Sequence, residues 1–104
     1  MQRDFDAVYT HGKTVKRPSC VFTWAPNTLQ FSRFGVVAGK RVGAAVVRAL
    51  VKRRIRAIAQ EIKDSLIKPS DIIISARPLA ARREFDELRR DIWEAARAAG
   101  LLKQ

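Results

Sequence analysis

The chain has very little of the side-chain chemistry from which disulfide frameworks and many catalytic sites are built. Of its 104 residues one is a cysteine, Cys20, and one is a histidine, His11. A single cysteine excludes an internal disulfide, and this usage is typical of proteins of a reducing cytoplasm. Because Cys20 is followed by Val21 and Phe22, we expect it to be a small buried hydrophobic residue.

Catalytic motifs are missing as well. The sequence contains no HExxH, CxxC, Walker or GxGxxG motif, and His11 stands beside Gly12 in a segment expected to be a loop. Nothing in it predicts a nucleophile–base pair, a metal-binding cage or a site for a small-molecule substrate. If the chain takes part in a reaction, we expect the catalytic groups to belong to a partner.

Long apolar runs are also absent. No segment approaches the roughly 20 apolar residues of a membrane span, and the first residues lack a signal-peptide pattern. Hydrophobic residues make up 47% of the chain, which is enough for a packed core. We therefore expect residues 1–104 to form one domain.

Positive charge, in contrast, is abundant. The 21 lysines and arginines exceed the 10 aspartates and glutamates, which gives a net charge of +11. No acidic residue occurs between residues 40 and 56, where the basic residues are Lys40, Arg41, Arg48, Lys52, Arg53, Arg54 and Arg56. This excess predicts a polyanionic partner, and the phosphate backbone of a nucleic acid fits it best.

Patterning in the first part of the chain predicts a helix and two strands. Residues 4–10 have apolar side chains at helical spacing, and the basic stretch 13–18 is expected to be a connection. Residues 19–25 and 31–38 read as strands, and their short connection favours antiparallel directions.

The second part predicts a long helix, a strand and a last helix. Residues 44–66 form the long helix, with an apolar stripe at Val47, Val51, Ile55, Ile58 and Ile62. The apolar residues 71–76 predict a strand buried on both faces, and 84–99 predict a helix stopped by Gly100. The order α-β-β-α-β-α predicts a small α+β sandwich with a mixed sheet that contains a βαβ crossover.

Beside the apolar stripe, the long helix has a basic side. At about 100° per residue, Arg48, Lys52 and Arg56 form a row, and Arg53 lies farther round on the same side. A solvated helix surface would explain the row, but acidic partners are missing. Because this helix lies between strands, a single-stranded RNA bound beside a sheet is favoured over helix-turn-helix DNA reading. The candidate base-stacking aromatics are Phe5, Tyr9, Phe22 and Trp24.

Several segments together resemble the bacterial ribonuclease P protein subunit. They are FGVVAGKRVGAAVVRALVKRRIR at 34–56, DIIISARP at 71–78, RDFDAVY at 3–9 with His11-Gly12, and FDEL at 85–88 with the ending AGLL. The resemblance implies an α–β sandwich with a left-handed βαβ crossover. It also implies a partnership with a large catalytic RNA, which with Mg²⁺ removes the 5′ leader from precursor tRNA. The protein would hold the leader in a groove between sheet and opening helix.

The resemblance also implies roles for particular residues. Lys40 and Arg41 match the family's basic pair before the helix, and the helix positions facing RNA are Arg48, Lys52, Arg53 and Arg56. Phe5 and Tyr9 match groove aromatics. On the first predicted strand a family tyrosine falls at Thr23, between Phe22 and Trp24.

The chain departs from the family at the centre of its motif. Where the family has arginine, asparagine and arginine, this chain reads Arg48-Ala49-Leu50. Ala49 lies on the cationic side, and Leu50 lies about 100° from the middle of the apolar stripe, where we expect it to be exposed. We expect weaker help with metal affinity and leader positioning than the family pattern provides.

Two other functions remain open on the residues alone. A structural protein bound to ribosomal RNA would carry the same charge. A basic module on a membrane surface is disfavoured, because the apolar stripe is needed for the core.

Overall fold

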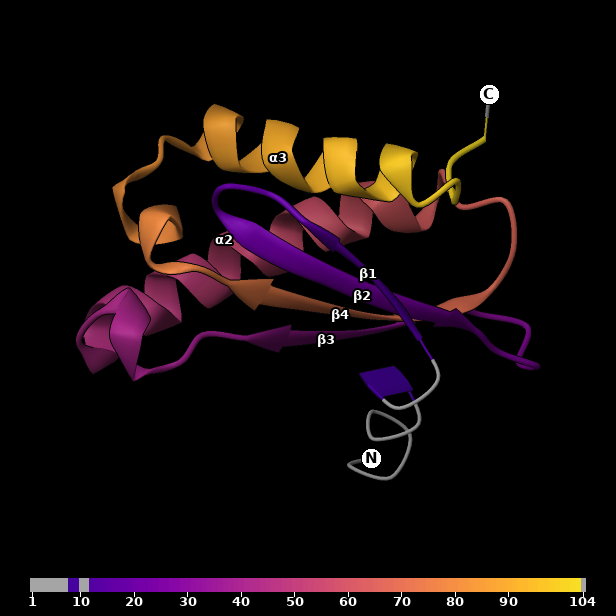
Figure 1. Cartoon of the computed structure of the whole chain (residues 1–104), viewed down its shortest axis with the longest axis horizontal. Coiled ribbons are helices and arrows are strands. Elements are labelled where there is room, and N and C mark those ends of the chain that lie inside the picture. Colours follow the sequence, from indigo (N-terminus) through magenta and orange to yellow (C-terminus); the bar gives the residue numbers. More distant parts are fainter. Residues whose placement is uncertain (1–7, 10–11, 104) are drawn as a thin grey trace.

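A four-stranded sheet with two long helices on one of its faces makes up the fold (Figure 1). The structure is a computed structural model that describes residues 8–9 and 12–103. The strands are β1 (Lys13–Lys16), β2 (Cys20–Pro26), β3 (Arg33–Val37) and β4 (Ser70–Ala76). The helices are α2 (Ala45–Lys63) and α3 (Phe85–Ala98), with short 3-10 turns η1 (Lys40–Val42) and η2 (Pro78–Arg82).

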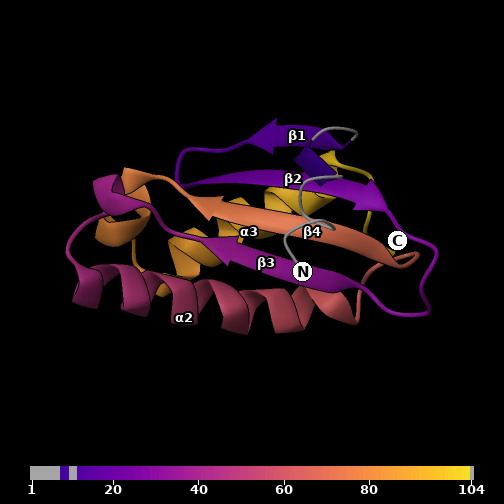
Figure 2. The ribbon, with the colours of Figure 1, turned by 90° about the horizontal axis from the view of Figure 1, so that it is seen from below.

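The opening helix predicted for residues 4–10 is described in part only. Val8 and Tyr9 are helical, and the rest of the prediction lies outside the described residues. The segment Val8–Tyr9 lies on the side of the sheet opposite the helices (Figures 1 and 2).

The sheet order is β1-β2-β4-β3, so the last strand lies between two earlier ones. β4 pairs antiparallel with β2 and parallel with β3. The βαβ prediction and the antiparallel directions of β2 and β3 are confirmed, but these two strands do not pair with each other. The short connection crosses the position of β4 instead, because the apolar run Ile72–Ile74 is buried and takes the centre of the sheet.

The edge strand β1 corrects a second prediction. Residues 13–18 were expected to form a connection, but Lys13–Lys16 pair antiparallel with β2 in a continuous register from Lys13↔Trp24 to Lys16↔Val21. A tight turn closes this hairpin, in which the Arg17 amide donates to the Cys20 carbonyl at 2.8 Å. Lysines are common on edge strands, where they oppose pairing with other chains.

Figures 1 and 2 also show the hand of the β3–α2–β4 connection. In Figure 2 both strands point the same way, and α3 lies behind the sheet. Seen from the helix side with both strands pointing up, β4 lies to the left of β3, so the crossover is left-handed. About 98% of such crossovers are right-handed. The unusual hand implied by the resemblance is therefore confirmed.

The core lies between the helices and the sheet. The predicted stripe of α2 is confirmed, since Val51, Ile55, Ile58 and Ile62 are buried and Val47 packs partly buried against them. They meet Ile72 and Ile74 of β4 and Phe22 of β2, and Cys20 is also buried, as its neighbours predicted.

Both helices end close to their predicted residues. α2 stops at Lys63 rather than 66, because Leu66 turns away to form a bridge with Leu102. α3 begins with a capping box between Glu84 and Glu87. It ends at Ala98, and two residues later Gly100 adopts a φ of +75°, so that the Leu101 amide donates back to the Ala96 carbonyl.

Candidate nucleic-acid interface

The two flanks of α2 face different surroundings. On one flank, Glu61 accepts hydrogen bonds from Arg89 (2.7 Å) and Trp93 (3.1 Å) of α3. At 100° per residue, Arg48, Lys52, Arg53 and Arg56 lie on the other side of the buried stripe. We call these four residues the cationic ridge. The ridge therefore faces away from α3.

The ridge is open to a partner. Arg53 and Arg56 are exposed, and Arg48 and Lys52 are half-buried. Within the described part of the chain none of the four forms an ion pair or a side-chain hydrogen bond, and the Nε of Arg48 is buried without a partner. The carboxylates that do form ion pairs there are those of Asp71, Glu87, Asp91 and Glu61, bound to Arg33, Arg83 and Arg89. The ridge charges are thus not neutralised by these groups.

The turn η1 adds two exposed cations next to the start of α2. Lys40 and Arg41 are solvent-exposed, and buried Val42 anchors the turn. The Val42 amide donates to the Gly39 carbonyl at 3.1 Å. The first turn of α2 contains no acidic residue, and its N-cap Ala44 forms no side-chain hydrogen bond. Positive charge accumulates at this end, because the helix dipole adds to it.

The turn η2 packs against η1 and contributes a further cation, Arg82, which was not predicted from the sequence. A cavity of about 300 Å³ between the two turns is lined by Arg41 and Arg82, with Leu79 between them in the lining. Arg82 follows the end of β4 and is exposed. The only sequence signal for it was its place soon after the DIIISARP segment, which gives no hint of its nearness to Arg41.

The register of the sheet decides which aromatics can meet a ligand. Phe22 is fully buried on the helix side, and Trp24 packs against the same core with its ring 6.3 Å from that of Phe22. The prediction that Phe22 lines a groove is wrong, and Trp24 does not face the groove side either. The side chains of alternate β2 residues, Thr23 among them, lie on the opposite face.

The open face of the sheet is partly covered by the N-terminal segment. Val8 is 1% exposed, whereas the neighbouring Tyr9 is 55% exposed and available for stacking. The Gly12 amide donates to the Val8 carbonyl at 2.7 Å. A Cβ at Gly12 would lie 2.3 Å from the Val8 carbonyl oxygen, so the close approach requires glycine. Phe5, the other groove candidate, lies outside the described residues.

The two departures from the family motif fall on different sides of α2. Ala49 is exposed on the side of the ridge, as predicted. Leu50 is half-buried rather than fully exposed, and it lies on the flank that carries Glu61. The two positions therefore do not belong to one surface.

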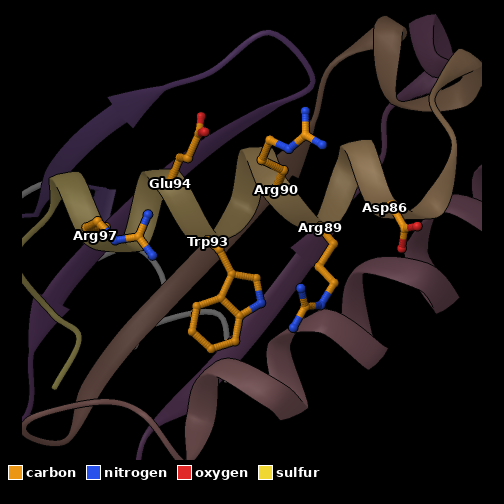
Figure 3. A pocket seen from close by; sticks show the side chains of 6 residues that line it. All are labelled: Asp86, Arg89, Arg90, Trp93, Glu94 and Arg97. Carbon is orange, nitrogen blue, oxygen red and sulfur yellow. The ribbon is translucent and has the colours of Figure 1, made fainter. Parts of the chain in front are cut away.

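The outer surface of α3 differs from the ridge. A hollow of about 520 Å³ is lined by Trp93 and by charged side chains of both signs, namely Asp86, Arg89, Arg90, Glu94 and Arg97, which Figure 3 shows as sticks. The Arg89 guanidinium lies 5.5 Å from the Trp93 ring centre and also binds Glu61. With charges of both signs and internal pairing, this surface is a weaker candidate for a polyanion.

Reactive groups are not gathered in the described residues. Burial raises the pKa of the Cys20 thiol to about 12, which leaves it protonated and unreactive at neutral pH. No group of three or more His, Cys, Asp or Glu side chains among the described residues could hold a metal ion. In the same part of the chain, no helix has the length and apolar character needed to cross a membrane.

Comparison with known proteins yields a consistent match. The family model described as Ribonuclease P matches residues 1–100. The Ribonuclease P protein component of Bacillus velezensis is 35% identical over 97% of this chain and 87% of its own length. That of Syntrophomonas wolfei is 29% identical over 95% of this chain and 83% of its own.

Solved structures match the fold. The Staphylococcus aureus RNase P protein superimposes with a TM-score of 0.89 at 25% identity, covering 99% of this chain and 94% of that one. The Thermotoga maritima RNase P protein gives a TM-score of 0.80 at 28% identity, covering 89% and 88%.

Proposed function

Since the chain belongs to the ribonuclease P protein family, we propose that it docks through its cationic ridge on the RNA subunit of ribonuclease P and assists removal of the 5′ leader from precursor tRNA. In this proposal the RNA and its Mg²⁺ ions perform the hydrolysis. The protein supplies binding and positioning.

One observation carries the proposal: the cations of the ridge and of η1 are exposed or half-buried and form no ion pair within the described residues. Like charges at i, i+4, such as Arg48 and Lys52, repel each other by a few tenths of a kcal/mol when no anion is near. Arginine suits a phosphate because its planar guanidinium can hold two oxygens at once. RNA would relieve this repulsion.

The leader fits best on the open face of the sheet. That face lies opposite the helices, and the ridge is on the flank of α2 that turns away from α3. The half-covered face offers the exposed Tyr9 beside buried Val8, whereas Thr23 of β2 is buried and its hydroxyl lies 3.3 Å from that of Thr14. A single strand placed there would have an aromatic ring to stack on and cations at its edge.

In this proposal the Mg²⁺ ions are bound by the RNA subunit. The described residues offer no cluster of ligands for a metal ion, so no step is assigned to a metal bound by this chain. The protein's contribution is indirect, because RNA phosphates neutralised by the ridge need fewer counterions. Nothing in the comparisons or in the described residues favours the alternative of a structural protein on ribosomal RNA.

Reconstitution tests the proposal. The cognate RNA subunit and a precursor tRNA are mixed at low Mg²⁺ with and without the protein, and release of the 5′ leader is measured. We expect the protein to raise the cleavage rate, and sequencing of co-purified RNA to recover the RNA subunit. Cleavage that is no faster with the protein, at any protein concentration, would refute the proposal.

A further inference from the structure

The end of the molecule where α2 stops carries a second basic hollow, which lies outside the ridge and η1. Two cavities of about 340 and 270 Å³ share Ile67 and Lys68 in their linings. The larger is lined by Phe31 and Lys63, and the smaller by Trp24 and Lys13. We call the two together the distal hollow.

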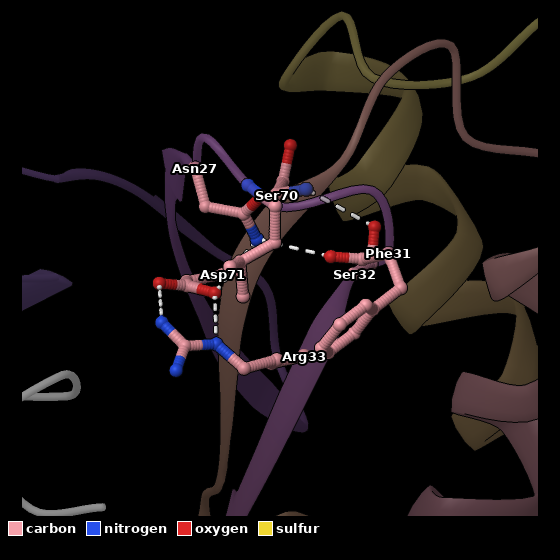
Figure 4. A network of polar contacts seen from close by, with 7 residues as sticks. Asn27, Phe31, Ser32, Arg33, Ser70 and Asp71 are labelled. Carbon is pink, nitrogen blue, oxygen red and sulfur yellow. Dashed lines mark hydrogen bonds and ion pairs between the residues drawn. The ribbon is translucent and has the colours of Figure 1, made fainter.

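Phe31 is held outward by a fixed loop. Its side chain is 56% exposed, although large aromatics are usually buried. Figure 4 shows the contacts that hold the backbone of this loop: the Asn27 amide donates to the Phe31 carbonyl (3.2 Å) and to the Asp71 carboxylate (2.9 Å). Arg33 holds the same carboxylate. Because the loop is fixed by these bonds, binding to Phe31 costs little ordering of the backbone.

Lysines line both cavities of the distal hollow. The lining includes Lys13, Lys63, Lys68 and Lys103, against one acidic residue, Asp64. Within the described residues none of these lysines pairs with a carboxylate, and Lys103 Nζ lies 3.5 Å from the backbone carbonyl of Asp64. Lysine is depleted in protein–protein interfaces. Aromatic rings between cations are typical of single-stranded nucleic-acid sites.

The distal hollow continues the ridge. Lys63 comes seven residues after Arg56, which is close to two full turns, so both lie on the same side of α2. From Arg48 to Lys63 the helix rises about 22 Å at 1.5 Å per residue. The positive surface of α2 therefore extends past the ridge to Lys63, which lines the same cavity as Phe31.

We propose that the distal hollow binds the part of the single-stranded 5′ leader that lies farthest from the tRNA body. Bases would stack on the exposed Phe31 ring and on the half-buried edge of Trp24, and phosphates would lie against Lys63 and Lys68. This inference rests on the proposed function. Single-stranded RNA is the fitting occupant, because paired bases cannot reach a protein ring.

The test compares precursor tRNAs with short and long leaders. Phe31→Leu keeps an apolar side chain but removes the aromatic ring, Phe31→Trp restores a ring, and Lys68→Glu reverses one charge. Arg90→Glu is the matched control, since it makes the same charge change on the outer surface of α3. Binding of each precursor to the reconstituted holoenzyme is measured, together with cleavage.

We expect Phe31→Leu and Lys68→Glu to weaken binding of the long-leader precursor by about 10-fold. Binding of the short-leader precursor should be unchanged, and Phe31→Trp and Arg90→Glu should behave as the unaltered protein. Equal effects on both precursors, or no effect of Phe31→Leu, would overturn the inference. So would a change of oligomeric state in Phe31→Leu by analytical ultracentrifugation, because the hollow would then bind a second copy.

The two proposals fail separately. Cleavage of the short-leader precursor reports on the proposed function, whereas the difference between the two leaders reports on the distal hollow alone.

Discussion

Arg33, the first residue of β3, donates two hydrogen bonds to Asp71, the second residue of β4. The Arg33 Nε lies 2.8 Å from Asp71 Oδ1, and a terminal guanidinium nitrogen lies 2.6 Å from Oδ2. The two residues are direct partners in the parallel register. The pair therefore holds the register at the point where the chain returns from α2, and it also supports the loop that presents Phe31.

Replacing Asp71 with asparagine should destabilise the protein. Asp71→Asn keeps the shape but removes the negative charge that accepts two hydrogen bonds from Arg33, and we expect the free energy of unfolding to fall by about 2 kcal/mol. Urea unfolding followed by circular dichroism measures this. The control is Asp64→Asn at an exposed carboxylate, which should change stability by less than about 0.5 kcal/mol. Equal losses in both variants would contradict the assigned role.

The same pair predicts a pH dependence. The hydrogen bonds from Arg33 hold the pKa of Asp71 below its ordinary value. As the pH falls, Asp71 therefore takes up a proton in the unfolded chain before it does so in the folded chain. The stabilisation that Asp71 contributes is complete above its unfolded pKa of about 4 and is lost as the pH falls through its lower folded pKa. Unfolding free energies measured from pH 5 downward should fall more steeply for the unaltered protein than for Asp71→Asn. Parallel curves would exclude this contribution.

Two neighbouring arginines offer a matched test of the ridge. Arg53 is exposed on the ridge, whereas Arg54 is half-buried toward the flank that carries Glu61. Arg53→Gln should reduce the slope of log Kd against log salt by roughly 0.7–0.9 for binding to the RNA subunit. Arg54→Gln removes the same charge and should leave the slope nearly unchanged. If both variants shift the slope alike, net charge rather than the ridge determines binding.

Replacing Ala49 with asparagine, the residue of the family pattern, should increase the cleavage rate at low Mg²⁺. Ala49→Asn places an amide on the ridge side of α2, where it can donate to RNA or to a metal-bound water, so cleavage at low Mg²⁺ should become faster. Leu50→Arg acts on the opposite flank and should add less. Cleavage rates of the two single variants and the double variant, measured across a Mg²⁺ series, separate the contributions. A gain found only with Leu50→Arg would place the RNA on the other flank.

The thiol of Cys20 should react only when the protein unfolds. It is fully buried, and desolvation raises its pKa to about 12. Iodoacetamide labelling at pH 8, followed by mass spectrometry, should be slow in the native protein and fast in urea. Rapid labelling under native conditions would show that β2 opens locally.

The parts of this fold that follow from local pattern were predictable from the sequence. The spacing of Val51, Ile55 and Ile58 on α2 and the glycine after α3 are local signals, and both elements were confirmed. Strand β1 was missed because its four residues, KTVK, become a strand only through pairing with β2. The central position of β4 in the sheet also depends on distant residues, because the sequence Asp71–Ala76 does not indicate which strands will pair with it.

The direction in which each face of β2 points, and the composition of the distal hollow, also depend on tertiary contacts. Alternation along β2 separates Phe22 from Thr23, but it cannot say which of the two faces the helices. The distal hollow combines Lys13, Lys63 and Lys103, which are about 40–50 positions apart in the sequence. The ridge could be predicted because all of its residues lie on one helix.

The central position of β4 has a consequence for synthesis of the chain. Until residues 70–76 emerge from the ribosome, β3 has no neighbour and β1 and β2 form an isolated hairpin, which is marginally stable in water. The apolar stripe of α2 stays exposed until β4 completes the sheet on which it packs. The arginines and lysines of α2 are already synthesised at that point. During that interval the exposed stripe leaves the nascent chain open to aggregation, and the like charges beside it oppose association of one such chain with another.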